Sequence, residues 1–320
     1  MTVHNRISVI IPVYNGARVI RDAVESLQKQ TYKEIEILVV DDCSTDETYK
    51  IVQSLALNDP RIVLLKTPFN MRSGGARNVA LSAMTGECVT LLDADDWWQP
   101  DRAEALLKKA TLLQADVLLD NLWIYDHVTE KIVGKTDFGS SKKTLKLGPN
   151  KFFWLDSTIR KSDSIGYSKP FIKVDFLKKN AVHYWQHYKT NEDYILIADL
   201  MMAGARFFII PEAYYVYRYQ TSPTTKEISP HSHAVESFLS IAESCNNLLS
   251  KYGSRLSLIA QWGLQYKRKF ALITPLAKKQ RQLFDNKHYW AALFLAFKHP
   301  YLSFFRLSML WQKIFGPKRF

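Results

Sequence analysis

The sequence predicts an α/β protein in which a mostly parallel central sheet is flanked by helices. Runs of apolar and β-branched residues at 7–12, 35–40 and 88–92 have the composition of buried strands. Stretches with apolar residues at helical spacing separate these runs, and short polar loops join them. Strands that alternate with single helices form βαβ units, whose strands are parallel and whose crossovers are right-handed.

Taken in order, the first part of the chain alternates strands with helices. Strands are expected at 7–12, 35–40, 61–66 and 87–92, with helices at 17–30, from about 45 to 57, and at 74–84. Pro12 ends the first strand, Ser44 or Thr45 caps the second helix, and Gly86 stops the third.

The second part of the chain is less regular. Strands are expected at 117–125, 129–133, 207–211 and 214–218, a short helix at 174–180, and helices at 234–251, 256–273, 281–298 and 301–315. Residues 136–150 are polar and are expected to form a mobile loop. A second loop is expected at residues 162–170.

Composition and charge divide the chain in two. At 320 residues with 47% hydrophobic and 23% charged residues, it can bury a large core and is not a disordered protein. After residue 250, 14 Lys and Arg face one acidic residue, Asp285, whereas residues 1–250 are almost neutral. We therefore expect a main domain, 1–228, and a basic helical extension, 229–320, and we expect no nucleic acid as a partner.

Cysteine usage and the chain ends bear on the compartment. Cys43, Cys88 and Cys245 are odd in number and lack metal-ligand spacing, which is typical of reduced thiols in the cytoplasm. A strand is expected within six residues of the N-terminus, so no signal peptide is expected. No apolar run approaches the roughly 18–20 residues that a membrane-spanning helix needs.

Polar side chains follow three of the expected strands. Tyr14 and Asn15 follow the first strand, Asp41 and Asp42 the second, and Asp93, Asp95 and Asp96 the fourth. In such sheets ligands bind beyond the carboxyl ends of the strands. Clustered carboxylates repel one another unless a cation offsets the charge, which indicates Mg²⁺ or Mn²⁺ bound with a diphosphate. The alternative is a polar turn in which Asp96 caps the helix that Pro100 opens.

Five motifs in series resemble the bacterial GT-A glycosyltransferases of family 2, which use sugar nucleotides. They are residues 10–15 (IIPVYN), 39–48 (VVDDCSTDET), 75–78 (GARN), 92–96 (LDADD) with Pro100, and Glu192-Asp193. The resemblance covers residues 6 to about 218 and is greatest to enzymes that build exopolysaccharides on a lipid carrier. Cys43 departs from it, since a glycine is usual there, but a residue as small as Cys still permits the turn.

The resemblance implies a set of residues around the donor. Asp42 would accept a hydrogen bond from uracil N3–H, and Tyr14 would border the base. Asp93 would face the ribose and the metal, and Asp95 would bind Mn²⁺ or Mg²⁺ directly. The full donor set is Pro12, Val13, Tyr14, Asn15, Asp42, Arg77, Asp93 and Arg218. Helix capping by Asp41 or Asp42 and a surface ion pair for Arg77 are the alternatives.

The resemblance also implies the catalytic residues. Asp193 would take the proton from the acceptor hydroxyl, with Glu192 orienting it, and a helix N-terminus keeps such a carboxylate ionised. A plain helix cap is the alternative. Arg218 would lie near the diphosphate, but Tyr219 and Gln220 stand where many relatives have a metal-binding histidine. Residues 166–170 and Trp185 are expected to border the acceptor.

The function implied is metal-dependent, inverting transfer of a hexose from a UDP-sugar to a hydroxyl of a lipid-linked saccharide, the acceptor being carried on a polyprenyl diphosphate. A nucleotidyltransferase is one alternative, although it needs a glycine-rich basic loop after the first strand, where Val13-Tyr14-Asn15 stand. A catalytically inactive membrane-bound scaffold is another.

The last 40 residues interleave aromatic with basic residues, from Trp290 and Lys298 to Trp311 and Arg319. Amphipathic helices of this composition lie on anionic membranes. We therefore expect the protein to be peripheral on the inner face of the bacterial cell membrane. Packing of these aromatics on the main domain is the alternative.

Overall fold

The computed structural model describes residues 5–139, 142–158, 165–188, 190–219, 235–286, 288 and 290. Its strands are β1 (Ile7–Val13), β2 (Ile35–Asp41), β3 (Ile62–Lys66), β4 (Cys88–Leu91), β5 (Trp97–Trp98), β6 (Val117–Asp126), β7 (Lys131–Lys135), β8 (Leu145–Leu147), β9 (Phe171–Lys173) and β10 (Phe207–Tyr219). Its α-helices are α1 (Ile20–Gln28), α2 (Thr48–Asn58), α3 (Arg72–Ala83), α4 (Arg102–Leu113), α5 (Pro149–Thr158), α6 (Val174–Lys179), α7 (Glu192–Met202), α8 (Val235–Tyr252) and α9 (Leu258–Asp285).

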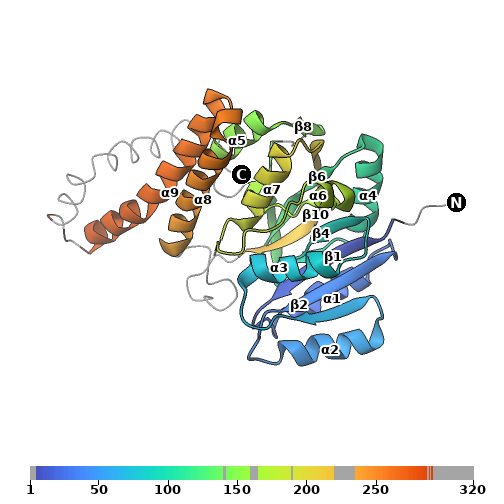
Figure 1. The fold of residues 1–320 in the computed structure, drawn as a ribbon. Coiled ribbons are helices and arrows are strands. Elements are labelled where there is room, and N and C mark those ends of the chain that lie inside the picture. Colours follow the sequence, from blue (N-terminus) through green and yellow to red (C-terminus); the bar gives the residue numbers. More distant parts are fainter. Residues whose placement is uncertain are drawn as a thin grey trace.

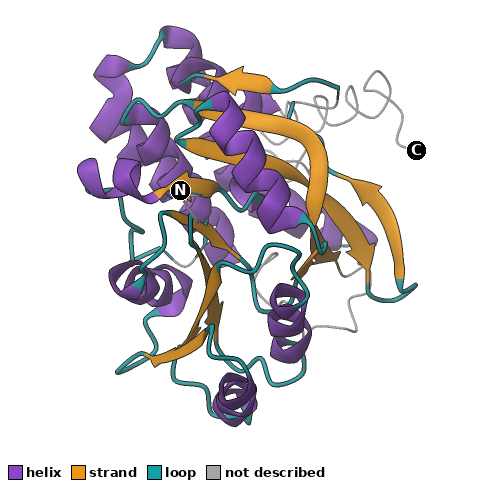
Figure 2. Ribbon diagram, turned by 90° about the vertical axis from the view of Figure 1, so that its right-hand side faces the viewer, coloured by secondary structure: helices purple, strands orange, loops and turns teal. Residues whose placement is uncertain are grey.

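One sheet runs through the molecule, in the order β3-β2-β1-β4-β9-β6-β10-β5. The first four of these strands are mutually parallel, and β6 and β10 also pair in parallel. The short strand β9 joins the two parts by pairing antiparallel with β4 and β6. Helices lie on both sides of the sheet, as Figure 2 shows. The predicted α/β class with a largely parallel central sheet is confirmed.

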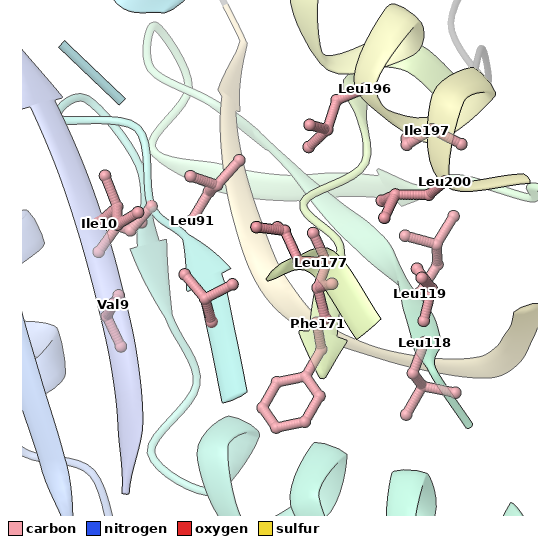
Figure 3. Packing of buried hydrophobic residues seen from close by; sticks show 14 of the residues in the cluster. Val9, Ile10, Leu91, Leu118, Leu119, Phe171, Leu177, Leu196, Ile197 and Leu200 are labelled. Carbon is pink, nitrogen blue, oxygen red and sulfur yellow. The ribbon is translucent and has the colours of Figure 1, made fainter. Parts of the chain in front are cut away.

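The core explains why the apolar runs form strands. Every residue of β2 and β4 is buried, and so is every residue of β1 except Pro12, because helices cover both faces of the sheet. Figure 3 shows side chains of β1, β4, β6, β9, α6 and α7 meeting in one cluster. The C-terminal helices α8 and α9 lie together beside α5, away from β1, β2 and β3 (Figure 1). The sheet therefore carries the site, while α8 and α9 extend the molecule on one side.

Several expected elements differ in the structure. Residues 207–219 form one strand, β10, in which irregular pairing near Ala213 replaces the expected gap. The loop expected at 136–150 instead contains a fully buried Phe138, the strand β8 paired with β10, and the start of α5. Its lysines hid the alternation of Leu145 and Leu147.

The helix ends also correct the sequence analysis. Neither Ser44 nor Thr45 caps α2; Asp46 accepts the hydrogen bond from the Thr48 backbone N–H at 3.0 Å instead. A break was expected between helices at 256–273 and 281–298, but α9 continues without one from Leu258 through Pro275 to Asp285. Most of the remainder of the expected helix at 281–298 lies outside the described residues. The helix expected at 301–315 and the boundary between 228 and 229 lie outside the described residues.

Candidate active site

The chain turns sharply at the carboxyl edge of the sheet. Asn15 and Cys43, which follow β1 and β2, have left-handed backbone angles (φ 52° and 63°), and so have Arg72 and Asn191 at the starts of α3 and α7 (61° and 74°). Non-glycine residues adopt this conformation at a cost, which is typical of functional edges. At Cys43 the expected turn forms although the usual glycine is absent, and the thiol donates to the Thr67 carbonyl at 3.2 Å.

Two aspartates at the end of β2 lie side by side but differ in their surroundings. Asp42 is buried, and its Oδ1 accepts from the Thr67 hydroxyl at 2.7 Å and the Met71 backbone N–H at 2.8 Å. Asp41 is fully buried, and neither of its carboxylate oxygens has a hydrogen-bond partner among the described residues. Neither residue acts as a helix cap. The loop before α3 thus fixes Asp42 at the edge of the sheet.

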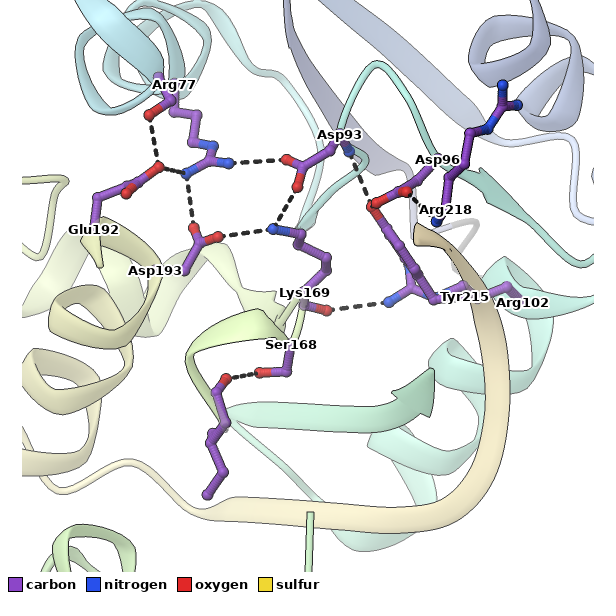
Figure 4. A network of polar contacts seen from close by, with 12 residues as sticks. Arg77, Asp93, Asp96, Arg102, Ser168, Lys169, Glu192, Asp193, Tyr215 and Arg218 are labelled. Atoms are coloured by element: carbon purple, nitrogen blue, oxygen red, sulfur yellow. Dashed lines mark hydrogen bonds and ion pairs between the residues drawn. The ribbon is translucent and has the colours of Figure 1, made fainter. Parts of the chain in front are cut away.

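Four charged side chains, which we call the charge ring, close a loop across the edge of the sheet: Arg77, Asp93, Lys169 and Asp193 (Figure 4). Arg77 donates to Asp93 at 2.9 Å and to Asp193 at 2.8 Å. Lys169 contacts the other oxygen of each carboxylate, at 2.7 Å and 2.8 Å. Asp93 follows β4 and Asp193 starts α7, so the ring joins segments 100 residues apart. Both Asp193 oxygens therefore already accept from a cation.

The charges in the ring stabilise one another. Burial alone would lower the pKa of Lys169, but Asp193 and Asp93 outweigh it and raise that pKa. Burial likewise lowers the pKa of Arg77, and Asp193 with its neighbours raises it well above the usual value. Burial alone would raise the pKa of Asp93, but Lys169 and Arg77 outweigh burial and lower that pKa below its usual value. All three groups are thus held in their charged forms.

Glu192 is a branch of this ring. Its Oε1 accepts from Arg77 at 2.9 Å and from the Ser73 hydroxyl at 2.6 Å. The sequence analysis placed Glu192 beside Asp193, and the structure shows that the two carboxylates share one guanidinium. Arg77 is therefore a buried hub with a 3% exposed side chain, and not the surface ion pair that was the alternative.

The other two aspartates of the β4 motif differ from Asp93. Burial and the Asp93 carboxylate raise the pKa of Asp95 to about 6, and Asp95 has no side-chain partner among the described residues. Asp96 accepts from the Tyr215 hydroxyl at 2.6 Å and from the Arg218 backbone N–H at 2.7 Å. The alternative interpretation, in which Asp96 caps a helix, is wrong, because α4 begins at Arg102, after Asp101. Asp96 is a buried link to β10.

The carboxylates after β4 could bind a divalent cation through one of their number. Among the residues that the structure describes, no group of three His, Cys, Asp or Glu could hold a metal ion by itself. Asp93 already faces two cations, whereas the half-buried Asp95 faces none at close range. Hard cations accept one carboxylate when substrate phosphates complete the shell. Of the two expected metal ligands, Asp95 is the one that the arrangement suits.

The remaining expected residues lie around this centre. Pro12 and Val13 end β1, and Val13 O accepts the Asp42 backbone N–H at 2.8 Å. Tyr14, the next residue, is 52% exposed. The Asn15 side chain accepts from the Thr45 backbone N–H at 2.8 Å.

Two expected residues have other partners. The Arg218 guanidinium reaches Asp22 at 3.1 Å and lies 5.1 Å from the Trp97 ring centre, away from the charge ring. The Trp185 indole donates to Asp199 at 2.8 Å and packs near Lys251. Gly75, the first residue of the GARN motif, leaves room for the Met71 side chain, since a Cβ there would lie 2.5 Å from it.

Sequence reasoning missed the role of Lys169 and Tyr215. Lys169 stands alone in a polar loop, and Tyr215 lies in an ordinary strand pattern, so neither carries a signal in one sequence. Tyr215 accepts from the Asp93 backbone N–H at 3.1 Å while it donates to Asp96, and it thereby fixes the whole β4 motif. Their importance follows only from where the fold places them.

The order of strands and helices, with carboxylates gathered at the carboxyl edge of the sheet, is the GT-A fold. The profile of "Glycosyl transferase family 2" matches residues 8–174, about half of the chain. The chain belongs to this family, and it is a glycosyltransferase, as the sequence analysis predicted.

Named relatives agree with this assignment. The chain is similar to the succinoglycan biosynthesis protein ExoO of Rhizobium meliloti, 30% identical over 66% of this chain and 60% of ExoO. It is 42% identical, over 29% of this chain and 36% of the relative, to the UDP-Glc:alpha-D-GlcNAc-diphosphoundecaprenol beta-1,3-glucosyltransferase WfaP of Escherichia coli. The matched part thus spans less than two thirds of either relative.

Solved structures share the fold. S. aureus TarS 1-349 in complex with UDP-GlcNAc matches with a TM-score of 0.65 at 22% identity, covering 86% of this chain and 76% of that one.

Among the described residues of this chain, no helix is both long and apolar enough to cross a membrane.

Proposed function

We propose that this enzyme transfers a hexose from a UDP-sugar to a hydroxyl of a lipid-linked saccharide in exopolysaccharide biosynthesis, with inversion and with a divalent metal. The charge ring carries this proposal, because it holds the carboxylate proposed as the base, Asp193, at a fixed distance from the carboxylate proposed to face the donor, Asp93. The names of WfaP and ExoO support a UDP-sugar, a diphosphate-linked acceptor and a role in polysaccharide synthesis.

The donor would lie along the edge of the sheet. Asp42 Oδ2 has no partner among the described residues and would accept from uracil N3–H, with Tyr14 against the base. Asp93 would face the ribose, and Arg218 would approach the diphosphate by exchanging its contact with the exposed Asp22.

Asp95 would hold Mn²⁺ or Mg²⁺ together with the donor phosphates. Bound there, the ion would supply Lewis-acid stabilisation of the negative charge on the departing diphosphate. Its positive charge would also offset the repulsion and burial that now raise the pKa of Asp95. Arg77 and Lys169 would hold Asp93 beside this position without binding the metal themselves.

The transfer itself is a single displacement. The acceptor oxygen attacks the anomeric carbon while its proton passes to Asp193, and the bond to the diphosphate breaks so that UDP leaves with the electron pair. Each Asp193 oxygen accepts one hydrogen bond from a cation of the ring, Arg77 or Lys169. Each oxygen also has a second lone pair that can accept from the acceptor hydroxyl. Arg77 and Lys169 thus orient the base, and Glu192 shares Arg77 with it.

Measurement of UDP release from UDP-hexose, with a polyprenyl-diphosphate-linked saccharide and Mn²⁺, tests this function. We expect the Asp193→Asn variant to lose about 10²–10⁴-fold in kcat because the proton has no acceptor, while UDP binds as before. Asp175→Asn, an exposed aspartate on α6, is the control. Pyrophosphate release in place of UDP would indicate a nucleotidyltransferase, and no turnover with any sugar nucleotide would indicate a scaffold.

The acceptor also suggests where the enzyme works. A polyprenyl-diphosphate carrier is embedded in a membrane, and a cytoplasmic sugar nucleotide reaches it from the inner face. We infer that the protein is peripheral there, on an anionic membrane surface, since the stretch after residue 250 is strongly basic.

A further inference from the structure

Helix α9 turns an apolar stripe outward. Leu258, Ile259 and Trp262 in its first turns are 82%, 61% and 51% exposed. Tyr266 follows one turn later, and Trp154 of the adjacent helix α5 is 39% exposed. We call these five side chains the docking face. Large exposed apolar groups gathered in one patch are typical of an interaction surface.

The aromatic rings of the docking face form a row. The Trp154 and Trp262 ring centres are 5.4 Å apart, and Trp262 stacks on Tyr266 at 5.4 Å. The exposed Lys269 lies on α9 seven residues after Trp262, and the exposed Arg255 lies in the turn just before α9, where it also donates to the Met202 carbonyl at 2.8 Å. Tryptophan and tyrosine flanked by basic side chains are typical of the membrane–water interface, where the rings enter the headgroup layer and the cations meet lipid phosphates.

The opposite side of α9 holds the docking face in place. Ala260, Leu264 and Ala271 are buried against the rest of the molecule. Lys267 forms an ion pair with the buried Asp156 of α5, and its ammonium lies 3.3 Å from the centre of the Tyr194 ring in α7. The apolar stripe is thus fixed outward by packing and cannot turn inward.

Charge indicates the kind of partner. Residues 251–285 contain eight Lys and Arg and one acid, and residues 286–320 contain six Lys and Arg and no acid. Both stretches therefore carry a net positive charge. An anionic surface attracts both. A nucleic acid would satisfy the charge but offers nothing apolar to Leu258 and Ile259, whereas a lipid bilayer offers both.

The docking face is connected to the catalytic centre. Asp156, two residues from Trp154, accepts the Ile165 backbone N–H at 3.0 Å. Ile165 begins the short 3-10 turn, Ile165–Tyr167, that precedes Lys169 of the charge ring. The helix pair that carries the docking face therefore also anchors the loop expected beside the acceptor.

We propose that the docking face seats the enzyme on an anionic lipid bilayer, with Trp154, Trp262 and Tyr266 at headgroup depth. This proposal rests on the proposed function only for its purpose, which is to bring the site to an acceptor carried in the membrane. The contact itself requires no catalysis and is tested separately.

The test is flotation of the full chain with vesicles of phosphatidylcholine, with and without phosphatidylglycerol. We expect the wild type to bind the phosphatidylglycerol vesicles, and Leu258→Ser with Trp262→Ser to weaken that binding at least about tenfold, because two apolar side chains no longer enter the lipid. The controls are Leu57→Ser on α2 and Leu112→Ser on α4, leucines that are 84% and 76% exposed elsewhere. Both should bind as the wild type does.

Leu258→Ser with Ile259→Ser, which leaves the aromatic row intact, is the second variant and should weaken binding in the same direction. Unchanged vesicle binding by both variants overturns the proposal. A lower melting temperature of both variants with unchanged vesicle binding also overturns it, and indicates that another part of the chain covers the face. If the wild type binds these vesicles and both variants lose that binding, but the wild type releases no UDP from any sugar nucleotide, the proposed function fails and the docking face stands.

Discussion

Two buried clusters lie close together in this enzyme, and each contains both positively and negatively charged side chains. The two clusters are built differently. One, which we call the core pair, joins Arg102 of α4 to Asp120 of β6, with side chains that are 0% and 1% exposed. The other is the charge ring, which opens toward the edge of the sheet through the 27% exposed side chain of Asp93. Both clusters bury charges, but only the charge ring, together with its branch Glu192, has more carboxylates than cations.

The core pair is complete in itself. Arg102 donates two hydrogen bonds to Asp120, at 2.8 Å and 3.1 Å, and its guanidinium lies 4.2 Å from the Trp98 ring centre. One cation matches one carboxylate in the bidentate geometry that suits arginine. Nothing in the pair calls for a further ligand, so its role is structural.

The charge ring is not balanced in this way. Arg77 and Lys169 face Asp93, Asp193 and Glu192, and the nearby Asp95 adds a carboxylate with no close cation among the described residues. The excess of negative charge suits a cation. Comparison of the two clusters teaches that shared cations and surplus carboxylates, rather than burial of charge, distinguish the candidate site from the core.

The two clusters also touch. Arg102 donates to the backbone carbonyl of Lys169 at 3.1 Å, while the Lys169 side chain closes the charge ring (Figure 4). The core pair thus fixes the backbone of the residue that bridges Asp93 and Asp193. Variants on the two sides of this contact separate stability from activity.

The largest expected effect is on the core pair. Arg102→Met leaves Asp120 buried and without its cation, so the free energy of unfolding should fall by about 3–5 kcal/mol. Urea unfolding followed by circular dichroism measures this change. Adding Asp120→Leu should recover most of the loss, because no unpaired charge then remains. If the single and double variants have equally reduced free energies of unfolding, the loss of stability comes from packing around Arg102 and not from the unpaired Asp120 charge.

The next effect concerns the bridge. Lys169→Met removes one of the two cations that orient Asp193, so kcat for UDP release should fall about 10–100-fold while the Kd for UDP changes little. Lys169→Arg keeps a cation and should recover part of the kcat. If Lys169→Met weakens UDP binding and kcat to the same extent, or if arginine gives no recovery, Lys169 does not position the base.

The smallest expected effect has the opposite sign. Because the pKa of Asp95 is about 6 in the folded state and about 3.8 in an unfolded chain, its charge destabilises the folded protein above pH 6. Asp95→Asn should therefore raise the free energy of unfolding by about 2 kcal/mol at pH 7.5 without metal. The gain should shrink as the pH falls from 6 toward 4. The exposed Asp101→Asn is the control, and a destabilised Asp95→Asn variant would contradict the idea of surplus charge.

The local sequence pattern predicted the structure correctly in segments whose own residues determine it. The apolar runs of β1, β2 and β4 are buried because helices cover both faces of the sheet, and the polar residues after them reach one edge because parallel strands end together. Pattern failed at residues 136–150, where pairing with β10 and the burial of Phe138 override a polar composition.

The sequence by itself determined the fold class, the family and the aspartates that follow the strands, since these depend on the order of residues along the chain. Only the tertiary structure decided that Lys169 bridges Asp93 and Asp193, that Tyr215 holds Asp96, and that α9 turns Trp262 outward. These contacts join residues tens of positions apart, and their strength depends on burial and distance, which no local pattern contains.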